Sequence, residues 1–466
     1  MGKSAVASIL TQSVAIDSGP ESVRRRMSVA AWLILAYVVI TRIGHLEAAK
    51  LGGLIGGIPV FLTEIFLILS FAAVMIRSPV PLIAWALGGG RTGPVSRAVW
   101  LIAVLATVHF VLAFGHYGMY AARDFAIYMY SLFFVLTYFA VPRREDAVRF
   151  LLCCTYAGVI MAVLLIVVAA SGLNLGLFGE GTRYVLGEVI ESRGSGDVGG
   201  IIAFSLASLG AYVLIDRRRR YFNLACAAIC FIALALPQTR SAVFGLALAG
   251  AFSMLALETR HRVAICCLVL LAVGIVVASP ALPDNLPGVQ ALQNFYAAMV
   301  SGAEYHADGN AQFRLARWTL ALQTWHDAPV FGVGFGVNIL PLWMDNLEDL
   351  NTFNYGLPHN TYLTILARTG LIGFALFAFP IVWTLRRIYR LMRRGEGSAH
   401  LLAAGNMICA MAGFGLFVLF FERPLHGATF WIMMAIAVRL IEFAEDAAAA
   451  AYAAQEADRE PAPATV

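Results

Sequence analysis

The sequence has too little charge to build a water-facing surface. Only 13% of its 466 residues are charged, and 60% are hydrophobic, whereas about a quarter of the residues of a soluble domain are charged. Lipid must therefore cover much of the folded chain, and we predict an all-α polytopic membrane protein. The net charge of +5 does not indicate a nucleic-acid partner, because no basic tract is interleaved with aromatic residues.

Cysteine is missing from the polar loops. All seven cysteines lie inside apolar runs, so we predict no disulfide framework and no thiolate metal site. No small-residue cleavage site follows the apolar residues 27–40, and we interpret them as an uncleaved first helix. We expect no metal and no other cofactor, because paired ligand spacing is absent from the outer histidines, which are His45, His116, His306, His326, His359 and His426.

Long apolar runs are abundant, and a bilayer needs about 20 apolar residues per helix. A short break at Pro237–Ser241 separates two of the runs. We predict about twelve transmembrane helices, over residues 29–46, 54–76, 98–115, 124–141, 150–171, 198–215, 221–237, 241–257, 263–279, 371–391, 401–420 and 426–443.

Arginines gather in alternate connections between these runs, for example at Arg217–Arg220 and Arg386–Arg394. Positive charge favours the cytoplasmic side, so we expect an inner-membrane protein with both termini in the cytoplasm. The predicted division of the chain is 1–279 with nine helices and a Gly-rich outer loop at 172–197, a large outer loop at 280–370, three helices within 371–443, and a cytoplasmic tail at 444–466 that frays from Glu445.

Arginines on the outer face are exceptions to this charge rule. Arg240 lies in the turn Pro237–Ser241, where it is either functional or an arginine snorkelling to the interface. Arg193 lies in the loop 172–197, whose acidic residues Glu188 and Glu191 are typical of an ordinary flexible loop with compensating charges.

A further pair, Arg314 and Arg317, lies three residues apart on a predicted amphipathic helix. Two guanidinium groups side by side suit a diphosphate, because each can bind oxygens bidentately. The alternative is a helix lying on anionic headgroups. The apolar face of this helix has three-four-three spacing and consists of Leu315, Trp318, Leu322 and Trp325.

His359 follows Pro358 and precedes Asn360 and Thr361, either of which can cap a helix. The positive end of the helix dipole disfavours imidazolium, so we expect a neutral ring that can accept a proton. The alternative is a histidine that only caps the turn. The three glycines within residues 331–336 favour a close backbone turn over a nucleotide site, because no Lys-Ser/Thr follows and no strand precedes them.

Together these motifs resemble the O-antigen ligase and O-antigen polymerase superfamily. The resemblance covers about residues 190–375, and its order and outer placement make it specific. The motifs that carry it are Thr239–Arg240–Ser241, Arg314 to Trp318, Pro329 to Gly334, His359 to Leu363, and Gly370 to Gly373.

The resemblance implies a glycosyltransferase whose fold is similar to the C-type enzymes. It implies a donor glycan on undecaprenyl diphosphate and, in a ligase, the lipid A–core oligosaccharide as acceptor. The family's essential histidine corresponds to His359, and its arginines to Arg240, Arg314 and Arg193. Arg317 is added from its place on the helix, and Asn360, Tyr362 and Trp318 are supporting residues.

Other functions fit parts of this pattern. An O-antigen polymerase or a protein O-oligosaccharyltransferase would share the histidine loop, although the helix number and the large late loop favour a ligase. A transporter of lipid-linked sugars would explain the spans and the outer arginines. It would also predict ionisable groups deep in several spans, whereas here they gather at the outer ends.

Overall fold

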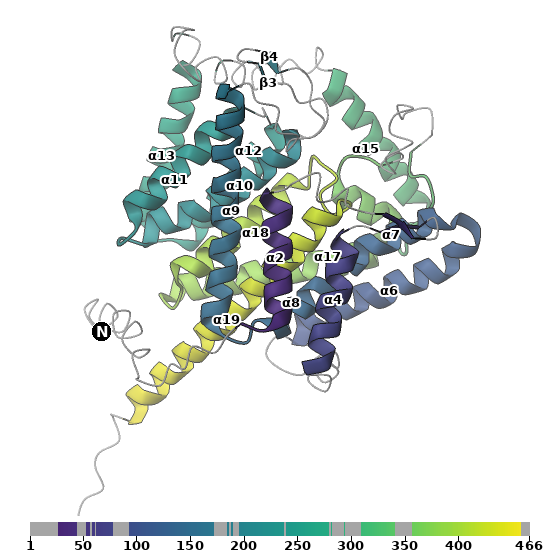
Figure 1. Ribbon diagram of the computed structural model, residues 1–466, viewed down its shortest axis with the longest axis horizontal. Helices are drawn as coiled ribbons and strands as arrows, with labels where there is room; N and C mark the ends of the chain where they lie inside the picture. Colours follow the sequence, from purple (N-terminus) through teal and green to yellow (C-terminus); the bar gives the residue numbers. More distant parts are fainter. Residues whose placement is uncertain are drawn as a thin grey trace, which may run out of the picture.

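Helices make up most of the part of the chain that the computed structural model describes (Figure 1). The structure describes residues 27–43, 53–55, 58–60, 62–77, 93–171, 184–185, 188–189, 195–236, 239–278, 281, 293, 309–340 and 357–457. The helices are α2 (Val29–Ile43), α4 (Leu62–Arg77), α6 (Gly93–Tyr117), α7 (Met119–Met129), α8 (Leu132–Ala140), α9 (Arg144–Ser171), α10 (Ser195–Ile215), α11 (Arg220–Ala235), α12 (Arg240–Ala256), α13 (Thr259–Ala278), α15 (Gly309–Asp327), α17 (Thr361–Arg394), α18 (Ala399–Phe414) and α19 (Pro424–Ala457).

Five of the described helices, α6, α9, α10, α17 and α19, are long and apolar enough to cross a membrane. Five shorter apolar helices accompany them: α2, α4, α11, α12 and α18. Large apolar side chains stay exposed on α6 and α13, such as Leu112 and Leu270, as expected where lipid covers the surface. The chain is an all-α polytopic membrane protein, and its number of spans stays a prediction.

The structure corrects three details of the sequence analysis. The span expected at 54–76 begins as a hairpin of two short antiparallel strands, β1 (Gly53–Ile55) and β2 (Ile58–Val60), and only α4 is helical. The span expected at 124–141 is broken into α7 and α8 at Tyr130, whose hydroxyl donates to Glu64 across 2.6 Å. A second hairpin pairs β3 (Tyr184–Val185) with β4 (Glu188–Val189).

The expectation that the tail frays from Glu445 is wrong, because α19 continues to Ala457. The run of alanines here has the highest helix propensity of any residue type. Glu445 also forms an ion pair with Arg387 of α17. The helix therefore extends beyond the other helices, as Figure 1 shows.

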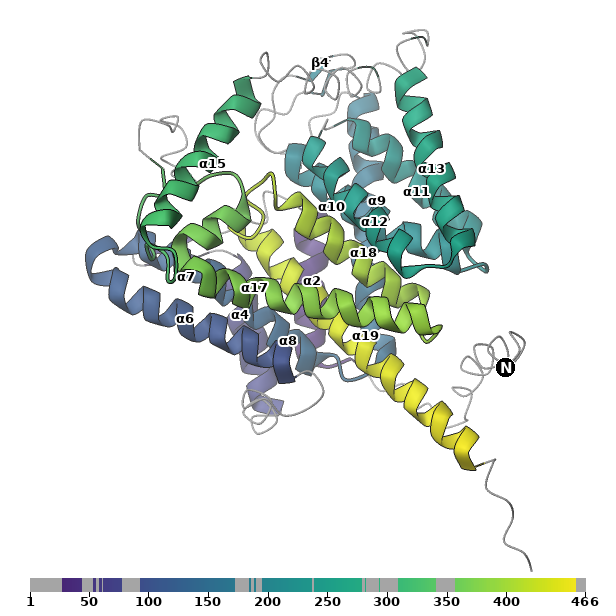
Figure 2. The same ribbon diagram turned by 180° about the vertical axis from the view of Figure 1, so that it is seen from behind.

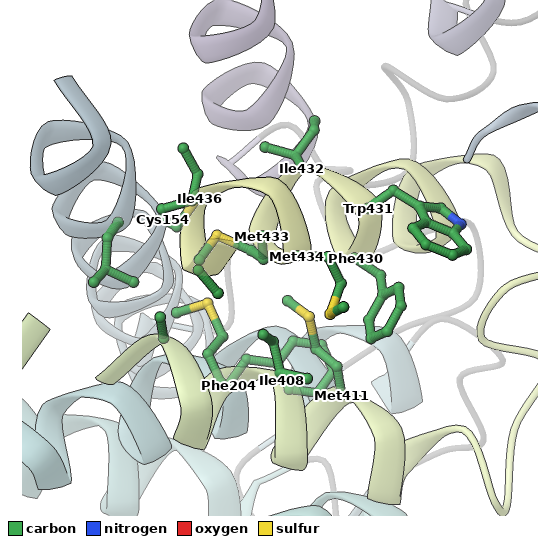
Figure 3. Close-up of a cluster of buried hydrophobic side chains, with 14 of the residues drawn as sticks. Cys154, Phe204, Ile408, Met411, Phe430, Trp431, Ile432, Met433, Met434 and Ile436 are labelled. Carbon is green, nitrogen blue, oxygen red and sulfur yellow. The ribbon is translucent and has the colours of Figure 1, made fainter. Parts of the chain in front are cut away.

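The core lies where α18 and α19 meet α9 and α10. Figure 3 shows Ile408 and Met411 of α18 beside Met433 and Met434 of α19. Glycines let the backbones approach closely: a Cβ on Gly245 of α12 would lie 2.5 Å from a carbonyl oxygen of α18. Small residues are the usual contact surface between membrane helices, and they explain how these short helices pack together.

Helix α15 lies at one end of the molecule, together with β3 and β4. The far end of α19 lies at the opposite end (Figures 1 and 2). Helix α15, a described part of the segment expected as a large outer loop at 280–370, and the end of the C-terminal helix therefore lie at opposite ends.

The segment after α15 pairs with the backbone of α17. Its amides donate to α17, with Val333 N and Gly334 N bonded to the carbonyl groups of Ala367 and Arg368 at 2.9 and 3.0 Å. In return, Leu371 N donates to the Pro329 carbonyl at 2.9 Å. Gly332, Gly334 and Gly336 all have positive φ, which confirms the predicted close turn.

Close approach at this turn demands glycine. A Cβ on Gly332 would lie 2.3 Å from the carbonyl carbon of Arg368. We expect Gly332→Ala to lower the free energy of unfolding by about 2 to 5 kcal/mol, from the left-handed backbone and the overpacking together. The thermal midpoint of the purified protein in detergent measures this.

Gly250→Ala is the control, because nothing lies within 4 Å of a Cβ at Gly250, in the middle of α12. We expect it to leave the midpoint unchanged or slightly raised. Equal midpoints for both variants would show that the turn does not constrain the fold.

Candidate active site

His359 occupies a strained position just before α17. Its φ is 53°, and it is the single non-glycine residue with positive φ in the described part of the chain. Asn360 is the N-cap of α17, and its side chain accepts from the amides of Tyr362 and Leu363 at 3.0 and 3.1 Å. The predicted cap is therefore confirmed. A left-handed conformation at a non-glycine residue costs about 1–3 kcal/mol and persists only when the surroundings hold it.

Two side chains of α15 bind the histidine segment, residues 357–360, through the carbonyl groups that precede His359. Arg317 Nη1 donates to the Leu357 carbonyl, and Trp318 Nε1 donates to the Pro358 carbonyl, each at 3.0 Å. Arg317 is only 2% exposed, so its guanidinium lies inside the protein against the histidine segment. The predicted helix over residues 310–325 is confirmed as α15, and its arginines and His359 are brought together.

The ring of His359 is held neutral. Burial is the main reason that its pKa falls to about 4, and the nearby guanidinium groups of Arg317 and Arg314 lower it further. A neutral ring was predicted from the helix dipole, but burial and these two positive charges cause it. Neutral imidazole is the form that accepts a proton.

Arg240 begins α12 and is exposed, with Thr239 as the preceding N-cap residue. One turn later on the same face, the ring of Phe244 lies 5.0 Å from the ring of Phe417. Phe417 also contacts Trp318 of α15 at 5.9 Å between centroids. This aromatic bridge joins the helix that begins at Arg240 to the helix that carries Arg314 and Arg317.

The remaining predicted residues differ in how far the structure places them. Arg314 is half-buried on α15. Tyr362 donates its hydroxyl to the Ala412 carbonyl at 2.8 Å, which ties the start of α17 to α18. Arg193 lies outside the described residues. In the parts of the chain that the structure describes, no three His, Cys, Asp or Glu side chains gather in a way that could hold a metal ion.

Residues 225–378 match the family model of the O-antigen ligases. Over this third of the chain, the protein is similar to the O-antigen ligases. The match includes α12, α15, the glycine turn and the histidine segment, and it ends within α17. No curated protein matches the chain. The ligase match supports a glycosyltransferase-type enzyme that uses a lipid-linked glycan donor and a lipid acceptor.

Glu422 lies beside the candidate site, and its contact there was not predicted from the sequence. It lies in the turn between α18 and α19, outside the matched region, and its carboxylate accepts from the hydroxyl of Thr361. Burial raises its pKa, and the hydroxyl groups of Thr361 and Thr364 partly offset this. In the sequence, Glu422 is an ordinary acidic residue at the end of an apolar run. It lies 61 residues from Thr361, and no local pattern predicts their contact.

A buried ion pair joins α17 to α7 near the candidate site. Arg368 Nη1 lies 2.6 Å from Asp124 Oδ2, and both side chains are almost fully buried. Asp124 accepts from the amide of Gly336 at 2.7 Å, and Arg368 donates to the Val337 carbonyl at 3.1 Å. Removing one partner of such a pair leaves a buried charge uncompensated, so this pair fixes α7, the glycine turn and α17 relative to one another.

Proposed function

We propose that the protein transfers O-antigen polysaccharide from undecaprenyl diphosphate onto the lipid A–core oligosaccharide. The reaction takes place at the periplasmic face of the inner membrane, with both termini in the cytoplasm. It requires no metal and inverts the anomeric configuration. The O-antigen ligase match over residues 225–378 supports the class of reaction, and the opposite placement of α15 and the end of α19 agrees with the orientation (Figure 2).

The observation that carries the mechanism is the placement of a neutral histidine beside arginines. An acceptor hydroxyl needs a base to become a nucleophile, and a buried neutral imidazole can take its proton. His359 is the base in this proposal. The acceptor oxygen forms a bond to the anomeric carbon while the bond from that carbon to the diphosphate oxygen breaks. The electron pair leaves with undecaprenyl diphosphate, and the hydroxyl proton goes to His359.

The leaving diphosphate needs its negative charge stabilised more than it needs protonation. Arg240 and Arg314 bind the diphosphate in this proposal, and Arg193 is a further candidate. Arg317 contributes its charge to the same site while its Nη1 atom is bonded to the Leu357 carbonyl. Binding of the diphosphate offsets the positive charges next to His359, which makes the ring a stronger base when the donor is present.

Loss of the gene followed by a gel of the lipopolysaccharide tests the proposal. If the gene encodes a ligase, its loss removes all long-chain forms of the lipopolysaccharide, while the lipid-linked polymer survives. A core carrying one repeat would instead identify a polymerase, and unchanged lipopolysaccharide would contradict both.

If the arginines bind the diphosphate, lysine at the same positions should support much less transfer. Arg240→Lys and Arg314→Lys keep the charge but lose the planar fork that binds two phosphate oxygens. We expect each to lower transfer about tenfold or more, with normal protein levels, because one charge-assisted hydrogen bond contributes about 1.5 kcal/mol or more. Arg390→Lys, on the exposed far end of α17, serves as the control. Near-full transfer by both site variants would show that charge alone suffices.

The base role predicts a distinct pH profile. His359 acts as the neutral ring, so its low pKa keeps the active form present down to about pH 4 in the free enzyme. We expect kcat/KM to fall only as the pH approaches this value. The acid limb of kcat should lie at higher pH, because bound diphosphate favours imidazolium.

His359→Ala and His359→Gln should both lower transfer about a hundredfold to ten-thousandfold, which is the usual loss of a general base. Binding of the donor should survive, because the arginines hold the diphosphate. A Gln variant that keeps half of the activity and the same acid limb would mean that His359 only positions the acceptor.

A further inference from the structure

The carboxylate of Glu422 forms the centre of a small network at the start of α17. Thr361 Oγ1 donates to this carboxylate and accepts from the amides of Phe420 and Phe421 at 2.9 and 3.2 Å. The backbone amide of Thr361 donates to the Gly415 carbonyl at 3.1 Å. Four hydrogen bonds therefore join the first residue of α17 to the turn between α18 and α19.

The burial of this carboxylate is costly. Glu422 is only 9% exposed, and burial of a carboxyl group without full compensation costs several kcal/mol. Of the charged groups nearby, Arg368 of α17 acts favourably on it, but Arg368 already forms its close ion pair with Asp124. A leucine would fill the space more cheaply, so packing alone does not explain an acid at this position.

The network binds the histidine segment on the side of His359 that α15 does not bind. His359 has a strained backbone, and α15 holds the carbonyl groups that precede it. Thr361 lies two residues after His359, on the other side of the strained residue. Hydrogen bonds on both sides of His359 prevent its backbone from leaving the left-handed conformation. With bonds on one side only, the other side could move and the strain would be released.

We propose that Glu422 and Thr361 are positioning residues of the transferase, which fix the start of α17 so that the ring of His359 meets the acceptor hydroxyl. This rests on the proposed function of His359 as the base. A misplacement of about 1 Å at a reacting group can cost about a hundredfold in rate. The network therefore acts on kcat and leaves donor binding by the arginines intact.

Four variants test the hydroxyl-to-carboxylate bond. Glu422→Gln and Thr361→Ser keep an acceptor and a donor, so we expect transfer within about threefold of the wild type. Glu422→Leu and Thr361→Val remove them at similar volume, and we expect kcat to fall about tenfold to a hundredfold with an unchanged KM for the donor. All variants are compared in detergent by thermal midpoint, so that loss of folded protein is recognised separately.

Thr429→Val is the matched control. Thr429 is also a buried threonine, and its hydroxyl donates to the Leu425 carbonyl in its own helix at 2.8 Å. The substitution is the same as at Thr361, but the hydrogen bond that it removes lies within α19 and does not involve α17. We expect it to leave transfer unchanged.

The double variant Thr361→Val/Glu422→Leu separates a shared bond from two independent effects. If the two residues act through one bond, the double variant loses no more than the worse single variant. Additive losses, a rise in the KM for the donor alone, or a Gln variant as inactive as the Leu variant would each overturn the proposal. If His359→Ala retained transfer, the proposed function of His359 would fail, and that result does not depend on Glu422.

Discussion

The two hydrogen bonds that α15 donates to the carbonyl groups of Leu357 and Pro358 hold the segment on which the candidate site depends. They come from adjacent residues of one helix, so they fix both the distance and the direction of the histidine segment. The glycine turn then returns the chain from α15 to the backbone of α17, where Val333 pairs with Ala367. Helix, turn and histidine segment form one unit, and Figure 2 shows α15 above α17 in this arrangement.

The charges in this unit suit the diphosphate substrate that we propose. Burial lowers the pKa of His359 to about 4, and the charges of Arg317 and Arg314 add to this, so the ring is a weak base. A diphosphate brings the opposite charge to the same place, and an opposite charge nearby favours the charged form of a histidine. In the proposed mechanism, the donor therefore strengthens the base that acts on its co-substrate, and proton transfer before the donor binds is disfavoured.

Local features of the site could be predicted from the sequence. The cap at Asn360, the helix that carries Trp318, and the glycine turn each follow from residue types at short spacing, and the structure confirms all three. The apolar face predicted for that helix is wrong, because Leu315 and Leu322 are exposed while Arg317 is buried. The contacts of Glu422 with Thr361 and of Asp124 with Arg368 could not be predicted, because each joins residues that are far apart in the chain. Likewise, the break between α7 and α8 depends on Tyr130 reaching Glu64 of another helix.

Transfer by the purified protein in liposomes tests the central claim most directly. The assay supplies undecaprenyl-diphosphate-linked glycan and lipid A–core, without ATP and without a proton gradient. The account predicts that glycan-bearing lipid A–core accumulates with the wild-type protein and not with His359→Ala incorporated at equal density. Movement of the donor across the bilayer with no transfer product would contradict it and would identify a transporter instead.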